Sequence, residues 1–397
     1  MGPQDHTKSR AISSKVVSEK RQTHGPAHSS TTSPLLSLPI FWPFAAAAMV
    51  SKTAAQYLDG LAETLSKNRQ LQDFTPPQWT TPNRIVLELP TMRLRDFSTR
   101  THGKPTLLCA PYALHGATIA DFAQGHSLVE ALRRGALFRV FVTDWHSANP
   151  EMRNFSIDTY LADLNVAVDE LGPPVDLIGL CQGGWMALLY AARFPKKVNR
   201  LVLAGAPVDI RAGQSHVSRL AADVPLSAFE NIVRFGEGRV QGRHMLEIWT
   251  PGLGADEADR ILQIWPDSEG SRDLESRFQE WNRTTVDLPG TYFLQVVRWL
   301  FKENQIAENR FVALGHQIDL TNIRNPMFLL AARDDELVAV EQLFATARLV
   351  GTPQSAIQTA TEPCSHLGLF LGRKTLAGPW QRIARWLQED IAIGLAS

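Results

Sequence analysis

The sequence predicts an α/β fold built on a mostly parallel sheet, and three observations support that prediction. Short apolar runs alternate with stretches of helical periodicity, as in a series of βαβ units. These runs are apolar at nearly every position, which a strand needs when helices cover both faces of its sheet. The alternation stops near residue 210 and resumes near residue 326, so two separate parts of the chain are expected to build the sheet.

The first part of the sheet is predicted from apolar runs and from the residues that stop the helices between them. The expected strands are 85–90, 106–112, 138–145, 175–180 and 200–207, and the expected helices are 126–135, 157–172 and 183–195. Gly135 and Gly172 stop the first two helices, because glycine readily caps a helix C-terminus, and Pro195 stops the third. The second part is expected to contain strands 326–336 and 355–360 and a closing helix over 380–391.

This order of elements is the plan of an α/β-hydrolase that carries a helical lid after its sixth strand. The expected segments are a disordered or poorly ordered tail (1–48), a helix and linker (49–82), the core in two parts (83–210 and 325–397) and the lid (211–324). A lid over the strand ends closes a pocket from which water is excluded. For the first segment, a targeting sequence and a chain start at Met49 are the alternatives to a tail.

Composition and charge exclude several classes of protein. A chain of 397 residues that is 44% hydrophobic and 20% charged is not wholly disordered. Forty basic residues balance forty acidic ones, so no overall basic field is present to hold nucleic acid. No apolar run reaches the roughly 18 residues of a membrane span. Three cysteines without a C-x-x-C pair argue against a disulfide scaffold and a cysteine zinc site, so we expect a cytoplasmic location.

The most specific motif is Gly-Leu-Cys-Gln-Gly-Gly at 179–184, between an apolar strand and a helix of small residues. A nucleophile elbow of the G-x-S-x-G type has this context, and here Cys181 takes the serine position. Small neighbours let strand and helix pass closely, and the helix N-terminus stabilises a thiolate. Cys181 is therefore the predicted nucleophile, with a buried core cysteine as the alternative. The N–H groups of Gln182 and of the loop around Tyr112 and Ala113 are the expected oxyanion donors.

An elbow nucleophile needs an acid and then a histidine further along the chain. Asp334 and Asp335 follow the strand predicted over 326–336, and either could serve as the acid. We prefer Asp335, because Leu337 and Val338 then follow it as the next packing residues. The base is expected to be His366, in the loop after the next strand. Three other histidines are interpreted as pocket-wall or surface residues: His115, His126 and His146.

Four segments together resemble the polyhydroxyalkanoate (PHA) synthase and intracellular depolymerase family. They are 177–210 with its Cys-Gln-Gly-Gly elbow, 278–305 with Trp-Asn and Leu-Pro-Gly, 318–338 with its strand and Asp, and 365–373 with its His. The sequence of this elbow motif is most similar to that of the class III-type synthases. The resemblance implies Cys181 as nucleophile, Asp335 as acid, His366 as base, and chemistry on 3-hydroxyacyl groups.

The sequence departs from the synthase pattern at two positions beside these residues. Glu336 stands where synthases usually carry His, and Ser365 stands where they usually carry Gly. The segments 110–122 and 142–145 are more similar to the intracellular depolymerases. The family assignment is therefore firmer than the direction of the reaction.

The predicted function is acyl transfer on 3-hydroxyacyl esters or thioesters, most simply PHA synthase-like polymerisation of 3-hydroxyacyl-CoA. An intracellular PHA depolymerase or hydroxyacyl-CoA thioesterase is the first alternative, and a non-catalytic granule-associated protein is the second.

No cofactor or metal is expected; coenzyme A enters only as part of a thioester substrate. The expected partners are that substrate and PHA polymer, with a homodimer or a partner subunit left open, and the expected place is the cytoplasm or PHA granules. Tyr112 and Trp281 are expected to line the substrate pocket, with plain packing inside the lid as the alternative for Trp281.

Overall fold

The structure is a computed structural model, and it describes residues 77–243, 245, 255–264 and 270–389. The expected tail over 1–48 and the expected helix that begins at residue 49 lie outside these residues. No helix in the described ranges is long and apolar enough to cross a lipid bilayer.

A sheet of eight strands forms the centre of the molecule, in the order β1-β2-β6-β3-β7-β8-β13-β14. The strands are β1 (Arg84–Glu88), β2 (Met92–Asp96), β3 (Thr106–Cys109), β6 (Val140–Trp145), β7 (Val175–Leu180), β8 (Val198–Ala204), β13 (Met327–Ala332) and β14 (Ile357–Glu362). Strand β2 pairs antiparallel with both of its neighbours, and every other pairing in this sheet is parallel. The predicted mostly parallel sheet of an α/β-hydrolase is therefore confirmed.

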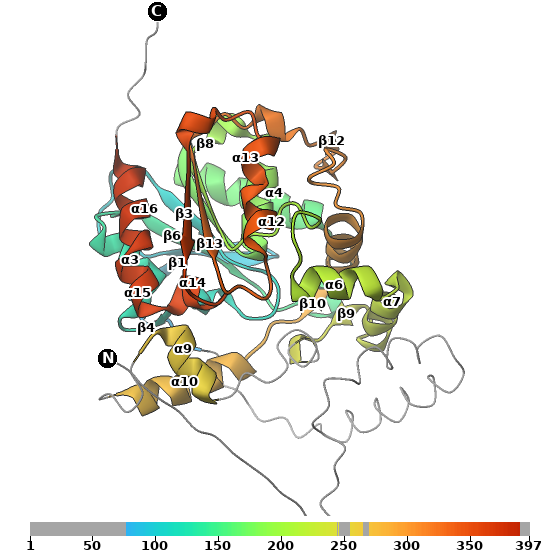
Figure 1. Cartoon of the computed structure of the whole chain (residues 1–397), viewed down its shortest axis with the longest axis horizontal. Coiled ribbons are helices and arrows are strands. Elements are labelled where there is room, and N and C mark those ends of the chain that lie inside the picture. Colours follow the sequence, from blue (N-terminus) through green and yellow to red (C-terminus); the bar gives the residue numbers. More distant parts are fainter. Residues whose placement is uncertain (1–76, 244, 246–254, 265–269, 390–397) are drawn as a thin grey trace, which may run out of the picture.

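Helices cover both faces of this sheet, as the apolar strands predicted. Figure 1 shows α3, α15 and α16 on one side and α4, α12 and α13 on the other, and α5 packs on β7, β8 and α4. These core helices are α3 (Leu128–Arg134), α4 (Ile157–Leu171), α5 (Gln182–Arg193), α12 (Val340–Phe344), α13 (Thr346–Leu349), α14 (Gly368–Leu371), α15 (Arg373–Ala377) and α16 (Pro379–Gln388). Gly172 ends α4 with a φ of 75°, a left-handed conformation that glycine adopts without strain.

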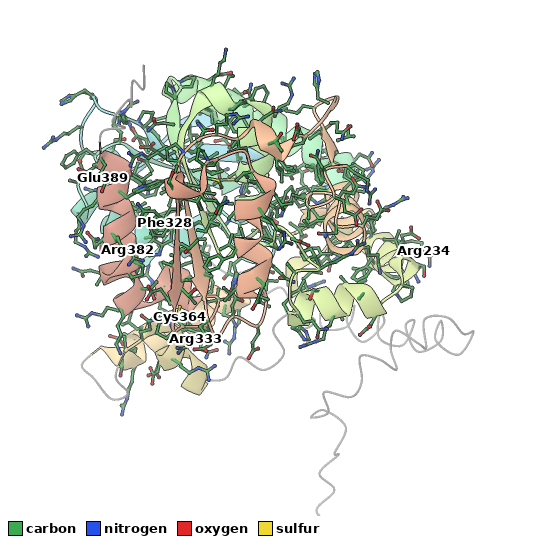
Figure 2. All side chains as sticks on the ribbon, turned by 45° about the horizontal axis from the view of Figure 1, so that its top comes forward. Arg234, Phe328, Arg333, Cys364, Arg382 and Glu389 are labelled. Carbon is green, nitrogen blue, oxygen red and sulfur yellow. The ribbon has the colours of Figure 1, made fainter. Side chains whose placement is uncertain are left out.

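The central strands are buried because side chains on both of their faces meet helices. Every residue of β3, β7 and β13 is buried. Phe328 of β13 lies beneath α16, with its ring 5.6 Å from the Arg382 guanidinium carbon and 5.7 Å from the Trp386 ring (Figure 2). Short elements complete the core: β4 (Asp121–Ala123), β5 (His126–Ser127), η1 (Ala117–Ala120), η2 (Pro150–Asn154), η3 (Pro195–Lys197) and η6 (Gln354–Ala356).

The chain between β8 and β13, which we call the insertion (residues 211–324), holds short helices and small strand pairs. Its described helices are α6 (His216–Asp223), α7 (Leu226–Phe235), α9 (Ala255–Leu262), α10 (Ser271–Arg283), α11 (Gly290–Gln295), the π-helix η4 (Val296–Lys302) and η5 (Leu320–Asn322). Its strands are β9 (Arg239–Val240) paired with β10 (Leu288–Pro289), and β11 (Val312–Ala313) paired with β12 (His316–Gln317). Strand β8 is the sixth strand of the central sheet along the chain, and the insertion follows it.

Candidate active site

Cys181 lies in the turn between β7 and α5, and its backbone has an unusual conformation. Its φ is 50° and its ψ is −118°, a region that non-glycine residues rarely occupy. The Cys181 N–H donates to the Ala204 carbonyl oxygen at 2.9 Å, which ties the turn to the neighbouring strand β8. Holding a residue in such a conformation costs about 1–3 kcal/mol, and conformations of this kind gather at functional sites.

The glycines of the motif allow α5 to start directly against the sheet. A Cβ atom on Gly183 would lie 2.1 Å from the Cys109 carbonyl oxygen, and one on Gly184 would lie 2.3 Å from the Ala206 Cβ. A Cβ on Gly179 would lie 2.5 Å from the Gly184 Cα. The spacing of small residues around Cys181 is therefore required by the close approach of α5 to β3 and to the end of β8.

Asp335 and His366 meet at the carboxyl ends of β13 and β14. The His366 Nδ1 atom lies 2.7 Å from Asp335 Oδ2, and both side chains are buried. The other carboxylate oxygen of Asp335 accepts from the N–H groups of Leu337 and Val338 at 2.8 and 2.9 Å, which fixes its orientation. The Asp334 side chain is 60% exposed and lies beside Arg333. Of the two acids that the sequence left open, Asp335 is the one that contacts the histidine.

The electrostatics of His366 follow from its neighbours. Burial lowers the pKa of His366, but the negative charges of Asp335 and of the Cys181 thiolate, with hydrogen bonds to both side chains, raise it well above its ordinary value of 6.5. A histidine bonded to a cysteine on one side and to a carboxylate on the other is the arrangement of an activated nucleophile. The structure thus brings Cys181, His366 and Asp335 together; their catalytic roles stay predictions.

This raised pKa predicts how stability depends on pH. Because the folded state holds the pKa of His366 above its unfolded value, the protonated imidazole adds stability that is fully present below pH 6.5. That contribution is lost as the pH rises through the raised pKa. We expect the free energy of unfolding of the wild type to fall with rising pH relative to that of His366→Gln, measured by urea unfolding from about pH 6 to pH 9. Parallel pH curves for the two proteins would contradict the charge assigned to His366.

Gln182 and Ala113, the predicted oxyanion donors, lie in the wall of the same cavity as Cys181. Gln182 is the first residue of α5, where backbone N–H groups have no partner inside the helix. Its side-chain oxygen accepts from the Trp185 indole N–H at 2.5 Å. Ala113 belongs to the loop after β3. The positions fit the predicted roles, which remain predictions.

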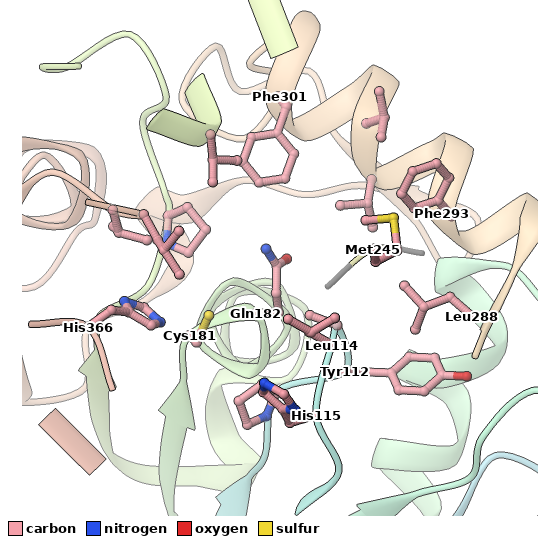
Figure 3. Close-up of a pocket in the computed structure, with 18 of the residues that line it drawn as sticks. Tyr112, Leu114, His115, Cys181, Gln182, Met245, Leu288, Phe293, Phe301 and His366 are labelled. Carbon is pink, nitrogen blue, oxygen red and sulfur yellow. The ribbon is translucent and has the colours of Figure 1, made fainter. Parts of the chain in front are cut away.

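A cavity of about 160 Å³ opens beside Cys181. Figure 3 shows Cys181, Gln182 and His366 toward one end and Leu288 and Phe293 toward the other. The core contributes Pro111, Tyr112, Ala113, Leu114, His115, Ile119, Cys181, Gln182, Pro207, Leu337, Val338, His366 and Leu367. The insertion contributes Val217, Met245, Leu288, Tyr292, Phe293, Val296, Val297 and Phe301. Apolar side chains dominate the walls, which suits an acyl chain.

Of the two predicted pocket residues, Tyr112 lines this cavity and Trp281 does not belong to its described lining. Trp281 is buried behind His115, with the two ring centroids 4.2 Å apart, so the prediction that it forms the pocket wall is corrected. The insertion instead supplies wall residues from η4 and the segment before it. Sequence reasoning missed these, because apolar residues of a short helix look alike whether they face a cavity or the core.

Of the three other histidines, His115 and His146 lie as the sequence suggested, in the cavity wall and near the surface, whereas His126 is buried away from the described cavity lining, with its Nδ1 atom 2.8 Å from the Leu371 carbonyl oxygen. His115 lines the cavity, and burial lowers its pKa to about 4, so it is neutral at ordinary pH. Burial also raises the pKa of Cys109 to about 12 and that of Cys364 to about 11, as for thiols in a core. Figure 2 shows Cys364 near Arg333 at the end of the sheet. There the Asp334 N–H donates to the Cys364 carbonyl oxygen. Within the described ranges, no group of three or more His, Cys, Asp or Glu residues is placed to hold a metal ion.

The backbone strain at Cys181 can be measured with two variants that both lack the thiol. We expect Cys181→Gly to be more stable than Cys181→Ala by about 1 kcal/mol, because glycine adopts the positive φ freely whereas alanine keeps the strained Cβ. The greater freedom of glycine in the unfolded chain reduces the difference. Urea unfolding of the two variants checks this prediction, and a more stable alanine variant would show that the turn is not strained.

Comparison with known families places most of the chain in one of them. Residues 87–385 match the model of the family DUF3141, described as a protein of unknown function. The match begins within β1, includes the insertion and ends within α16.

Three curated relatives from different organisms carry the same printed name. Proteins named poly(3-hydroxyalkanoate) polymerase subunit PhaC are 26% identical to this chain in a Synechocystis species and 24% identical in Haloferax mediterranei and Allochromatium vinosum. These alignments cover 89%, 79% and 72% of this chain, respectively. They cover 97% of the Synechocystis protein, 65% of the Haloferax protein and 81% of the Allochromatium protein. The relationship to the PHA synthases that the sequence motifs suggested is confirmed.

Solved structures with similar folds are more distant. A monoacylglycerol lipase from Paleococcus ferrophilus aligns over 75% of this chain and 98% of its own, with a TM-score of 0.49 and 16% identity. An enol-lactonase from Burkholderia xenovorans aligns over 78% of this chain and 100% of its own, with a TM-score of 0.48 and 15% identity.

Proposed function

The chain belongs to the DUF3141 family, and from its site we propose that it transfers 3-hydroxyacyl groups from coenzyme A thioesters to a growing polyhydroxyalkanoate chain. The observation that carries the proposal is the contact of His366 with Asp335 on one side and Cys181 on the other, at one end of an apolar cavity. The curated relatives, named as PHA polymerase subunits, support the choice of substrate.

In the first half-reaction, the proton of the Cys181 thiol already rests on His366, whose raised pKa favours the imidazolium, and the Cys181 thiolate attacks the thioester carbonyl carbon. The N–H groups of Gln182 and Ala113 stabilise the negative charge that forms on the carbonyl oxygen. The intermediate collapses: the bond from the carbonyl carbon to the coenzyme A sulfur breaks, and His366 returns its proton to that sulfur. The products are free coenzyme A and an acyl thioester on Cys181. Exchanging one thioester for another changes the free energy little, which favours cysteine over serine as the nucleophile.

In the second half-reaction, the hydroxyl end of the polymer is the acceptor. His366 takes the hydroxyl proton, the oxygen attacks the acyl-Cys181 carbonyl, and the bond from that carbon to the Cys181 sulfur breaks. The proton stays on His366 beside the Cys181 thiolate, which restores the starting state of the site. Water can replace the hydroxyl in the same step, and the product is then a free hydroxy acid. The apolar walls that the insertion adds, such as Phe293 and Phe301, disfavour water and so favour transfer over hydrolysis.

The proposal also covers the oligomeric state of the protein and its location in the cell. The growing polymer is the partner that remains bound between turnovers, so the protein is expected on the surface of PHA granules in the cytoplasm. The word subunit in the relatives' names supports an active form with more than one chain, either a homodimer or a complex with a second subunit. Light scattering of the purified protein, alone and after incubation with substrate, measures this directly.

The experiment that tests the proposal uses purified protein and 3-hydroxybutyryl-CoA. We expect coenzyme A release together with oligomeric or polymeric 3-hydroxybutyrate, and neither product with Cys181→Ala. Free 3-hydroxybutyrate as the sole acyl product would reassign the protein as a hydrolase. Release that is equal in the wild type and in Cys181→Ala would refute the proposed catalytic chemistry.

A further inference from the structure

The loop that carries Ala113 is held by the insertion. The Val286 N–H donates to the Leu114 carbonyl oxygen at 3.0 Å, and His115 Nδ1 lies 3.1 Å from the Thr284 carbonyl oxygen. The lowered pKa of His115 leaves its ring neutral, so this contact is a hydrogen bond from Nδ1–H to the carbonyl. The position of the predicted oxyanion loop therefore depends on residues from a different part of the chain.

Tyr292, at the start of α11, contacts the peptide group that carries the Ala113 N–H. Its hydroxyl donates to the Tyr112 carbonyl oxygen at 3.4 Å, and both side chains are buried. The Tyr112 carbonyl and the Ala113 N–H belong to one planar trans peptide unit and point in opposite directions. A donor on that carbonyl therefore fixes the direction of the Ala113 N–H and polarises it. The same hydroxyl also lies 3.7 Å from Met186 Sδ, but a thioether sulfur is a weaker acceptor than a carbonyl oxygen.

We propose that Tyr292 is a positioning residue that orients the Tyr112–Ala113 peptide so that the Ala113 N–H stabilises the oxyanion during acyl transfer to Cys181. The inference rests on the proposed function for its reaction, because an oxyanion forms only when an acyl carbonyl is attacked. Tyr292 does not touch the reacting atoms in this role. It acts through the backbone of the loop after β3, so the insertion becomes part of the catalytic machinery as well as a wall of the cavity.

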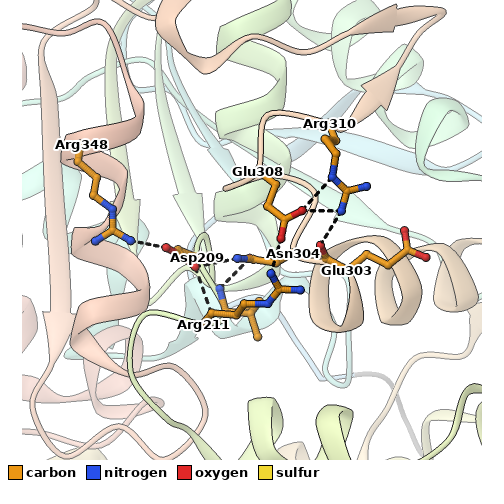
Figure 4. Close-up of polar contacts among 8 residues, drawn as sticks. Asp209, Arg211, Glu303, Asn304, Glu308, Arg310 and Arg348 are labelled. Atoms are coloured by element: carbon orange, nitrogen blue, oxygen red, sulfur yellow. Dashed lines mark hydrogen bonds and ion pairs between the residues drawn. The ribbon is translucent and has the colours of Figure 1, made fainter.

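The insertion is also attached to the core by a second set of contacts, made by Asn304 just after η4. Asn304 Nδ2 donates to Asp209 Oδ1 at 2.8 Å, and Asn304 Oδ1 accepts from the Ile210 N–H at 3.0 Å (Figure 4). Beside these contacts, Asp209 pairs with Arg348 of α13 within the core, and Arg211 pairs with Glu308 within the insertion. Removing the single hydroxyl of Tyr292 leaves this attachment in place, so the variant Tyr292→Phe tests orientation of the loop and not loss of the insertion.

The test compares two reactions of the same thiol in the full-length protein. Acylation of Cys181 by p-nitrophenyl butyrate forms the S–C bond, breaks the bond to nitrophenolate and passes through an oxyanion. Alkylation by iodoacetamide displaces iodide and develops no charge on a carbonyl oxygen. We expect Tyr292→Phe to lower the acylation rate constant about tenfold, part of the 10²–10³-fold that a whole oxyanion donor contributes. The ester concentration for half-maximal rate and the alkylation rate at Cys181 are expected to stay unchanged.

The matched control is Tyr190→Phe, which removes the hydroxyl of another buried tyrosine, one that bonds Asn165 on the far side of α5. Its acylation and alkylation rates are expected to equal those of the wild type. An equal loss of acylation in both variants, a parallel fall of acylation and alkylation in Tyr292→Phe, or no loss at all would each overturn the inference. Failure of the proposed function is distinguishable, because the wild type would then be acylated by the ester but release no coenzyme A from 3-hydroxybutyryl-CoA. If p-nitrophenyl butyrate does not acylate Cys181 of the wild type, the inference also falls.

Discussion

Cys181→Ala is expected to lower coenzyme A release from 3-hydroxybutyryl-CoA by about 10⁵–10⁶-fold, because no other group in the cavity replaces a lost nucleophile. Cys109 and Cys364, the other two cysteines, are buried and do not line the cavity, so neither thiol is placed to take over. Release of coenzyme A is followed with a thiol reagent, and circular dichroism confirms that the variant is folded.

The matched control for this loss is Cys364→Ala, which removes a buried thiol two residues before His366. We expect its turnover to stay within a few-fold of the wild type, because Cys364 contacts none of the reacting groups. If Cys181→Ala keeps even one per cent of wild-type turnover while folded, the nucleophile is another residue and the mechanism is wrong.

Asp335→Asn is expected to lower kcat about 10³–10⁴-fold, with a much smaller effect on KM. An asparagine fills nearly the same space, but it has no charge to stabilise the protonated imidazole, and its NH₂ group can hold His366 in the wrong tautomer. Asp335 is also a major cause of the raised pKa of His366, so that pKa should fall in the variant. Steady-state kinetics at several pH values measure both effects.

The neighbouring residue supplies the control. Asp334→Asn removes a carboxylate one position earlier in the chain, but that side chain is exposed and lies beside Arg333. Its kcat is expected to match the wild type. Equal losses in Asp334→Asn and Asp335→Asn would mean that the turn as a whole matters, and that the 2.7 Å contact of Asp335 with His366 has no special role.

The elements that position the triad could be predicted because each depends on local sequence. The strand over 175–180 is observed as predicted, since an apolar run bounded by Pro174 and the elbow leaves little choice of ends. The predicted strands 106–112 and 200–207 extended too far at their carboxyl ends. Pro111, Tyr112 and Pro207 continue the apolar runs there. These three residues line the cavity and are not part of the hydrogen-bonded strands of the sheet.

Two other features were not predicted. Strand β2 has the sequence Met-Arg-Leu-Arg-Asp, whose alternation is typical of a strand buried on one face and differs from the continuous apolar runs that predicted the other strands. Part of the cavity wall, and contacts that hold the loop after β3 such as that of Tyr292 with Tyr112, 180 residues apart in the chain, come from the insertion. Such contacts depend on how the insertion packs against the core, and no local sequence motif indicates them.

Cys181 is expected to carry the acyl group during turnover, and trapping the acyl-enzyme intermediate shows whether it does. The protein is mixed with 3-hydroxybutyryl-CoA, quenched in acid within the first turnover and digested, and the peptides are analysed by mass spectrometry. The account predicts a 3-hydroxybutyryl thioester on the peptide that contains Cys181, which hydroxylamine removes and which Cys181→Ala lacks. Coenzyme A release with the acyl group on a different residue, or with no covalent intermediate under conditions where turnover continues, would contradict it.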